Sequence, residues 1–230
     1  MRNIDVLLWE DNITARSISR VLDKYPDITL FTQNSLFDGF FPDLIILTHP
    51  DPYSGLNQRL DALIKYPGTP IMYIRDSLDI VALSALFLSG IEYLISGDST
   101  GEEIHRCIVV AGNTAKDQWS QKQRTRFLNQ KYATISGEKL SCRELAVVGG
   151  LVRAYKREKL AMLLGITLTD VNIMCYSSCK KLGIRTRDLH SVKFIKRFGS
   201  LESSVTTKKY NIKTVRKRPG YFVIPKLWYE

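Results

Sequence analysis

The sequence predicts an α/β domain built on a parallel sheet, followed by a smaller all-α domain. Short apolar segments alternate with helical patterns over residues 4–110, which is the rhythm of βαβ units. Residues 140–187 instead show three helical patterns joined by short turns. The charge is divided in a similar way. Residues 1–112 contain 8 Lys and Arg against 15 Asp and Glu, whereas residues 113–230 contain 25 against 8. Only the basic half is therefore expected to meet a polyanion.

The apolar and amphipathic runs place each element of the first domain in order. Strands are expected at Ile4–Trp9, Thr29–Thr32, Asp43–Leu47, Ile71–Ile74 and Tyr93–Ile95. Helices are expected at Ile13–Lys24, Leu56–Lys65, Asp79–Ser89 and Glu102–Ala111. The third strand is almost wholly apolar, as a strand buried on both faces should be. The chain contains neither the G-x-G-x-x-G motif nor the G-x-x-x-x-G-K-S/T motif, which are the glycine-rich loops that bind nucleotide phosphates. No nucleotide site is therefore indicated.

In the second domain, the apolar spacing predicts a helix through Leu160 and Leu164, then a turn, then a new helix from Thr167. The inward stripe of this new helix holds Val171, Cys175 and Cys179. The outward stripe holds Thr169, Asn172, Ile173, Tyr176 and Lys180. Two helices joined by a short turn, with polar and basic side chains on the second, have the geometry that fits a helix into the DNA major groove.

This segment resembles the four-helix, helix-turn-helix DNA-binding domain of the LuxR/FixJ/NarL regulators. The landmarks are Leu140-Ser141, Arg143-Glu144, Ile166-Thr167, Val171, Lys181-Leu182-Gly183-Ile184 and Arg187. The family usually carries Thr-Val-Lys and a His in its recognition helix. In those places this chain has Asp170, Val171, Asn172 and Met174. The resemblance implies the docking mode of the family, with a different preference for DNA sequence.

Two sets of residues are expected to form the DNA interface. The residues expected to face bases are Thr169, Asn172, Ile173 and Tyr176. An Asn side chain suits bidentate contact with adenine, and an apolar side chain suits a thymine methyl group. The residues expected to hold phosphates are Lys156, Arg157, Lys180, Lys181 and Arg185. The alternative is that Ile173 and Tyr176 lie between protomers and that the basic residues form a solvated face.

Residues 1–112 resemble the receiver domain of bacterial response regulators, a doubly wound, flavodoxin-like sheet of five strands. The acidic pair after the first strand is present as Glu10-Asp11, and Pro42–Leu47 resembles the lead-in to the phosphoacceptor. The acceptor Asp, the switch Ser or Thr, and the Lys of the family are replaced by Thr48, Arg75 and Ser96.

These replacements predict a pseudo-receiver that is not phosphorylated. Acyl-phosphate formation needs a carboxylate nucleophile, a Mg²⁺ ion held by carboxylates, and a Lys. A threonine hydroxyl with no nearby base is a poor nucleophile. The metal site also loses one carboxylate, so neither a metal nor another cofactor is expected. Arg75 either pairs with Glu10 or Asp11, or points to solvent, and the sequence favours neither.

The chain is expected to divide into a pseudo-receiver at 1–112, a linker at 113–136, the helix-turn-helix domain at 137–199 and an extension at 200–230. The linker is polar and basic, which indicates an interdomain helix or a tether. The extension combines basic clusters with an aromatic end. It is expected either to contact phosphates or to pack as a strap on the first domain or on a partner.

Several function classes are excluded by what the sequence lacks. Cys107, Cys142, Cys175 and Cys179 have no paired CxxC spacing and are expected to be reduced core residues. No nucleophile–base pair is visible, so no catalytic residue is expected. No apolar run is long enough to span a bilayer, and nothing resembles a signal peptide, so a soluble, cytoplasmic protein without a membrane partner is expected.

The leading hypothesis is therefore a sequence-specific transcription regulator that binds double-stranded DNA independently of phosphorylation. The symmetry of most operators favours a homodimer. The alternative is a protein-interaction subunit, or anti-regulator, that pairs with another regulator because its altered helix no longer reads DNA alone.

Overall fold

The computed structural model describes residues 3–37, 39–75, 80–91, 93–97, 99–114, 131–133, 139–191, 194–195 and 198. These residues form two compact units. The first unit contains the described residues up to 75 and those from 91 to 114, and the second contains residues 80–90 and those from 131 onward. The extension expected at 200–230, and most of the linker expected at 113–136, lie outside the described residues.

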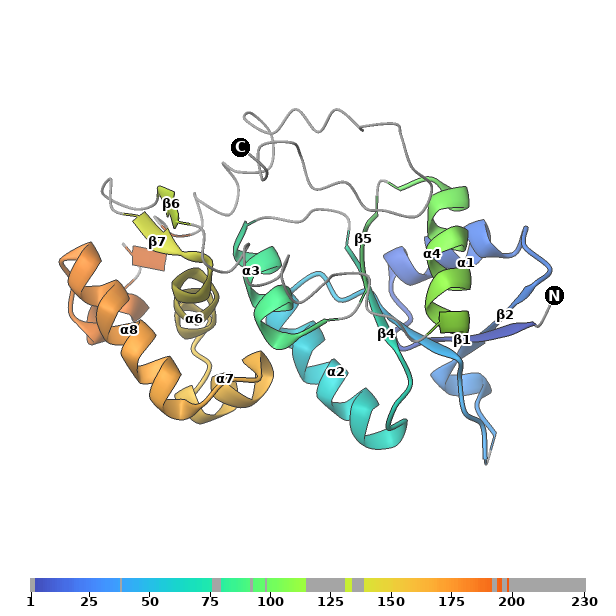
Figure 1. The fold of residues 1–230 in the computed structure, drawn as a ribbon, viewed down its shortest axis with the longest axis horizontal. Coiled ribbons are helices and arrows are strands. Elements are labelled where there is room, and N and C mark those ends of the chain that lie inside the picture. The colour runs from blue at the N-terminus through green and yellow to red at the C-terminus, as the bar shows by residue number, and fades with distance from the viewer. Residues whose placement is uncertain are drawn as a thin grey trace. The chain divides into compact units, whose positions relative to one another are not determined.

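The first unit is built on a parallel sheet of five strands in the order β2-β1-β3-β4-β5 (Figure 1). The strands are β1 Ile4–Leu8, β2 Ile28–Thr32, β3 Leu44–Leu47, β4 Ile71–Arg75 and β5 Tyr93–Ser96. This order is that of a flavodoxin-like, doubly wound sheet, so the predicted fold class is confirmed. β3 is buried along its whole length, which is why its residues are all apolar.

The helices of the first unit cover the sheet through their apolar faces. They are α1 Ile13–Leu22, α2 Pro52–Lys65 and α4 Gly101–Thr114, with a 3-10 turn η1 at Gln33–Ser35. α1 and α4 share one core with the strands. α2 begins at Pro52 rather than at Leu56, because the Asp51 carboxylate accepts a hydrogen bond from the Ser54 N–H at 2.8 Å and Pro52 suits the first turn.

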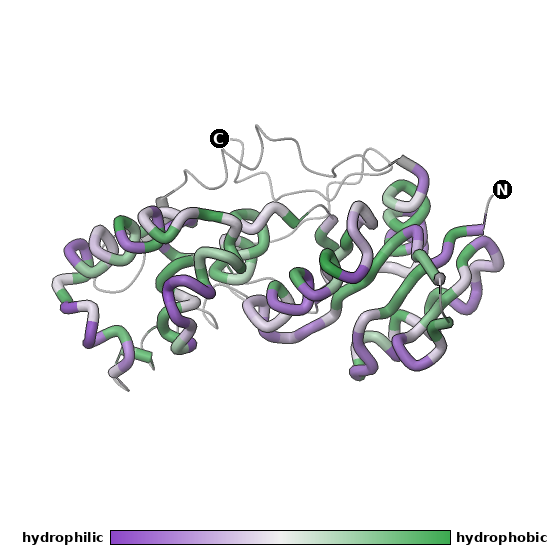
Figure 2. The backbone as a smooth tube through the Cα atoms, turned by 90° about the horizontal axis from the view of Figure 1, so that it is seen from below, coloured by the Kyte–Doolittle hydropathy of each residue, from purple (hydrophilic) through white to green (hydrophobic). Residues whose placement is uncertain are grey.

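The second unit is mainly helical. Its helices are α3 Ile80–Ser89, α6 Cys142–Val152, α7 Arg157–Leu164 and α8 Leu168–Leu182, followed by a 3-10 turn η3 at Thr186–His190. α3 lies between β4 and β5 in the chain but clusters with this unit, where it packs on α6. It is apolar on all sides, as a fully buried helix should be. Figure 2 shows hydrophilic and hydrophobic colours alternating along the other helices.

A short hairpin precedes α6. It pairs β6 Lys131–Ala133 with β7 Lys139–Ser141 in antiparallel register. Residues 113–136 were expected to form a helix or a tether, and β6 was not predicted there. A strand of three residues is too short to show an alternating apolar pattern. In the described part of the chain no single helix is long and apolar enough to cross a membrane. α7 and α8 reach that length and apolar composition only when taken together, and they are bent by 107° at the break between them.

Candidate nucleic-acid interface

α7 and α8 form the predicted helix-turn-helix. α7 ends at Gly165, whose φ of 63° is the left-handed conformation that glycine adopts most easily. Thr167 then caps α8, because its hydroxyl accepts from the Asp170 N–H at 3.0 Å and the Asp170 carboxylate accepts from the Thr167 N–H at 3.2 Å. The hydrogen bond from the Thr167 hydroxyl holds the pKa of Asp170 below its ordinary value. The carboxylate at position 170 therefore has a structural reason.

α8 has one buried stripe and one exposed stripe. The buried residues are Val171, Cys175, Ser178, Cys179 and Leu182, which confirms the predicted inward stripe. The exposed stripe contains Thr169, Asn172, Ile173, Tyr176 and Lys180, and Ile173 and Tyr176 are 60% and 69% exposed. Since large apolar side chains are usually covered, this stripe is suited to meet a partner. All four residues expected to face bases thus lie on one exposed surface.

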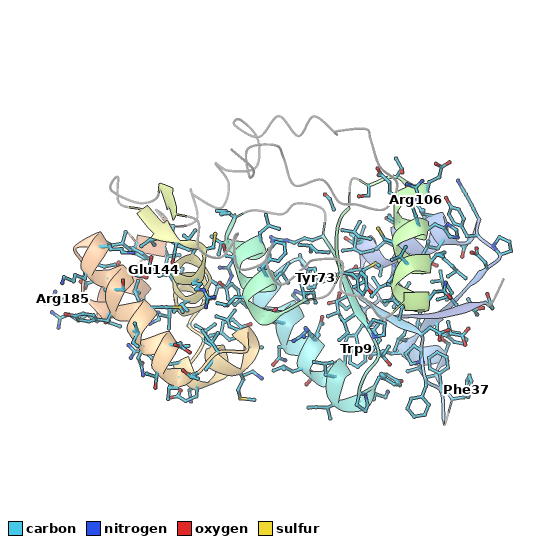
Figure 3. All side chains as sticks on the ribbon, in the orientation of Figure 1. Trp9, Phe37, Tyr73, Arg106, Glu144 and Arg185 are labelled. Atoms are coloured by element: carbon cyan, nitrogen blue, oxygen red, sulfur yellow. The ribbon has the colours of Figure 1, made fainter. Side chains whose placement is uncertain are left out.

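The five basic residues of the expected interface differ in their surroundings. Lys156, the residue before α7, and Lys180 on α8 are both exposed. Arg185 is exposed at the start of η3, where its guanidinium lies 3.4 Å from the Asp188 carboxylate (Figure 3). Lys181 and Arg157 instead make contacts that hold the helices together. The interface is therefore best supported at Lys156 and Lys180.

Lys181 belongs to a network around Glu144 on α6. Its ammonium donates to both carboxylate oxygens of Glu144 at 2.7 Å, and the Ser177 hydroxyl donates to one of them at 2.7 Å. Glu144 also accepts from the Ser141 N–H at 2.8 Å, so it caps α6 as well. Burial alone would raise the pKa of Glu144, but these hydrogen bonds together hold the pKa below its usual value. The network fixes α8 against the start of α6.

The structural role of Glu144 could have been predicted from the sequence. The spacing of Ser141 and Glu144 is that of a capping box. Only its partners, Lys181 and Ser177, needed the tertiary structure, because they lie more than thirty residues further along the chain.

Arg157, the first residue of α7, reaches across to α8. One guanidinium nitrogen donates to the Asn172 side-chain oxygen at 2.8 Å, and another lies 3.7 Å from the Cys175 sulfur. Arg157 therefore connects the first turn of α7 to the exposed stripe of α8. This contact could not be predicted from local sequence patterns, since it depends on the angle between the helices.

Three of the four cysteines lie in the protein interior, as expected, whereas Cys107 is half-buried. All four are free thiols, and Cys142, Cys175 and Cys179 are buried. Burial raises the pKa of Cys142 to about 12, and burial together with the neighbouring Cys175 raises the pKa of Cys179 to about 11. These thiols are therefore protonated at neutral pH and poor metal ligands. The described residues contain no group of three or more His, Cys, Asp or Glu that could hold a metal ion.

The residues expected to form a degenerate phosphorylation site lie at the carboxyl edge of the sheet. Thr48, which follows β3, donates its backbone N–H to the Glu10 carboxylate at 2.8 Å, and its hydroxyl lies 2.8 Å from the same oxygen. Asn12 donates to this oxygen at 3.2 Å and to the Thr48 carbonyl at 3.3 Å. The expectation that Thr48 has no nearby base is wrong, because Glu10 lies beside its hydroxyl. Asn12 is a further member of this network that was not predicted, because its only sequence signal is its place before α1.

The same network closes off Thr48 from solvent. The residue is 3% exposed, and its hydroxyl is enclosed between Glu10 and the Asn12 side-chain oxygen, 3.1 Å away. Asp11 does not complete a cluster with Glu10 and Thr48, because its carboxylate pairs with Arg16 on α1 at 2.8 Å. This pairing, led by the hydrogen bond from Arg16, holds the pKa of Asp11 below its ordinary value.

Arg75 and Ser96 end the neighbouring strands β4 and β5 and pair in register. One guanidinium nitrogen of Arg75 is fully buried, so the side chain does not simply point to solvent. Beside it, Tyr73 is enclosed in the unit and donates its hydroxyl to the His49 carbonyl at 2.6 Å. A Cβ atom at Gly55 would lie 2.3 Å from that hydroxyl, so residue 55 has to be glycine. Tyr73 is thus packed against Gly55 on α2 and hydrogen-bonded to the segment after β3.

No known protein-family description matches this sequence, and no curated protein matches it. Solved structures do. RcsB from Salmonella enterica serovar Typhimurium, bound to promoter rprA with the phosphomimetic BeF₃⁻, is 14% identical over 89% of this chain and all of its own, with a TM-score of 0.53. RcsB bound to promoter P1flhDC is 13% identical over 86% of this chain and all of its own, with a TM-score of 0.51. This chain therefore has the fold of response regulators that join a receiver domain to a LuxR/NarL-type helix-turn-helix domain.

Proposed function

We propose that this chain is a sequence-specific, DNA-binding transcription regulator that places α8 in the major groove and acts as a dimer. The observation that carries the proposal is the exposed stripe of α8, formed by Thr169, Asn172, Ile173 and Tyr176, opposite a fully buried stripe. A helix fixed on one side and bare on the other is what major-groove reading requires. The RcsB structures with similar folds are bound to promoter DNA, which supports this use of the fold.

Charge supports the same function. The half of the chain that contains the helix-turn-helix carries most of the Lys and Arg residues. Lys156 and Lys180 are exposed near the two ends of the α7–α8 pair, where side chains can reach phosphates on either side of a groove. Binding through such contacts releases counterions, so it weakens steeply as salt rises.

Regulation does not require phosphorylation of the receiver-type unit. The Thr48 hydroxyl is buried against Glu10, and Asp11 is already paired with Arg16. A phosphoryl donor would have to break these hydrogen bonds to reach a weak nucleophile. A change of dimer contacts or a bound partner is therefore the proposed input.

The test is a gel-shift titration of the full chain with random-sequence duplex DNA at several salt concentrations. Wild type should lose affinity as salt rises, and Lys180→Ala should make the slope of log affinity against log salt shallower by about one unit. Lys24→Ala removes the same charge from an exposed site on the first unit and should leave the slope unchanged. Wild type that does not bind, or that binds with no salt dependence, would contradict the proposal.

The second candidate, a protein-interaction subunit, is favoured by one observation. Ile173, Tyr176, Met162 and Leu168 are all exposed on α7 and α8, and such apolar surfaces also suit a partner protein. In that case Ile173→Ala and Tyr176→Ala would weaken co-purification with another regulator while the wild type showed no affinity for duplex DNA.

A further inference from the structure

The contact between Arg157 and Asn172 fixes how the exposed stripe of α8 presents its amide. Arg157 donates to the side-chain oxygen of Asn172 at 2.8 Å. Its other nitrogen lies 3.7 Å from Cys175, which is 1% exposed and held in the core. The guanidinium therefore spans from a buried anchor to an exposed side chain. Its planar, rigid fork limits how far the partner amide can turn.

The chemistry of the two groups decides which end of the amide faces Arg157. A guanidinium has only donors, so only the oxygen of Asn172 can face it. The amide nitrogen, with two N–H donors and no acceptor, is then turned away from Arg157. A hydrogen bond from a charged donor is about twice as strong as a neutral one, so this orientation is favoured over its flip.

We infer that Arg157 is a positioning residue that makes Asn172 a hydrogen-bond donor at the DNA-reading surface, so that this position selects guanine over adenine. The inference rests on the proposed DNA-binding function. In the major groove guanine presents two acceptors, N7 and O6, whereas adenine presents the N7 acceptor and the N6 amino donor. The adenine amino group would compete with Arg157 for one oxygen and would place a second donor beside the guanidinium. The bidentate adenine contact expected from the sequence is therefore disfavoured.

The experiment selects binding sites for the full-length protein from a library of duplexes with a randomised core. The base pair read by Asn172 is identified as the one whose preference disappears in Asn172→Ala. At that base pair, wild type should favour guanine over adenine by about 5-fold to 100-fold, the range of one good base contact. Arg157→Ala frees the amide to contact both groups of adenine, so the preference should move toward adenine.

A second variant keeps the contact but removes the donors. Asn172→Asp still accepts from Arg157, and it has no N–H to offer a base, so the guanine preference should be lost. Lys156→Ala, one residue before Arg157 and exposed, is the matched control. It should lower affinity for all sequences and leave the base preference unchanged. Circular dichroism establishes that each variant is folded.

The outcomes separate this inference from the proposed function. Wild type that selects a site, with the same base preference in Arg157→Ala as in wild type, would overturn the role of Arg157 and leave DNA binding intact. A wild-type preference for adenine at that base pair, or a guanine preference retained in Asn172→Asp, would overturn it as well. Wild type that enriches no sequence and binds no duplex would overturn both.

Discussion

The carboxyl edge of the sheet and the outer stripe of α8 both contain polar side chains. At the sheet edge these side chains are buried and hydrogen-bonded to one another, whereas on α8 they are exposed. At the sheet edge Thr48 is 3% exposed and its hydrogen bonds are completed by Glu10 and Asn12. On α8, Tyr176 is 69% exposed and Asn172 is exposed as well. A ligand at the edge must break existing hydrogen bonds, whereas a ligand at α8 meets groups that still face solvent.

The exposed stripe of α8 nevertheless depends on other side chains of the same helix that are hydrogen-bonded to α6. Glu144 on α6, labelled in Figure 3, accepts hydrogen bonds from Ser177 and Lys181 and so joins α6 to α8. A helix such as α8 can be exposed along one stripe only because the rest of its surface is held in a single position.

The largest effect is expected at the supporting network. Glu144→Ala removes the side-chain half of the α6 capping box and leaves Lys181 without its carboxylate, so the free energy of unfolding should fall by about 2–4 kcal/mol. Because Lys181 is one-third exposed, water compensates part of the loss. The measurement is chemical denaturation, with Glu158→Ala, an exposed acidic residue on α7, as control.

The same network predicts a pH dependence. The folded protein holds the pKa of Glu144 below its ordinary value of 4.5. Its contribution to stability is therefore complete above about pH 4.5 and is lost as pH falls through the lower folded value. The difference in stability between wild type and Glu144→Ala should narrow over that acidic range, and a constant difference would contradict the role given to the carboxylate.

Thr48→Asp tests the closed edge. The change restores the chemistry of a phosphoacceptor but puts a second carboxylate within hydrogen-bonding distance of Glu10. We expect a loss of about 1–3 kcal/mol at neutral pH, because like charges repel and the hydroxyl donor is gone. Mg²⁺ should recover part of this stability. Thr48→Val, which removes the donor without adding charge, should show no such recovery.

A smaller gain is expected at the turn before α7. Ala154 has a φ of 62°, a left-handed conformation that a side chain disfavours. Ala154→Gly should raise the free energy of unfolding by about 1 kcal/mol and leave DNA affinity unchanged, since the turn lies outside the exposed stripe of α8. A thermal unfolding scan measures the first quantity and the gel-shift titration the second.

The last prediction is that no reaction occurs. Incubation with acetyl phosphate and Mg²⁺ should leave the mass of the wild-type protein unchanged, because Thr48 is buried and hydrogen-bonded. A gain of one phosphoryl group within residues 43–56, coupled to tighter DNA binding, would contradict the prediction that the carboxyl edge of the sheet is closed to phosphoryl donors.

Much of the architecture could be predicted from local patterns. The strands and helices of the first unit follow from alternating apolar runs, and the inward stripe of α8 follows from its four-residue spacing. Short or irregular features were missed. β6 is too brief to show a pattern, and α2 begins earlier than its apolar spacing indicates.

The sequence by itself determined which residues are polar, basic or apolar, and it therefore predicted that one half of the chain suits DNA and that Thr48 replaces a phosphoacceptor. Only the tertiary structure decided which polar groups satisfy one another. Glu10 and Thr48 lie far apart in sequence, as do Glu144 and Lys181, or Arg157 and Asn172. A hydrogen bond requires a distance of about 3 Å and a suitable direction. For residues from distant segments, the order of the strands and the crossing of the helices set this distance and direction. Local spacing encodes burial, whereas the availability of a side chain for a partner is a property of the folded protein.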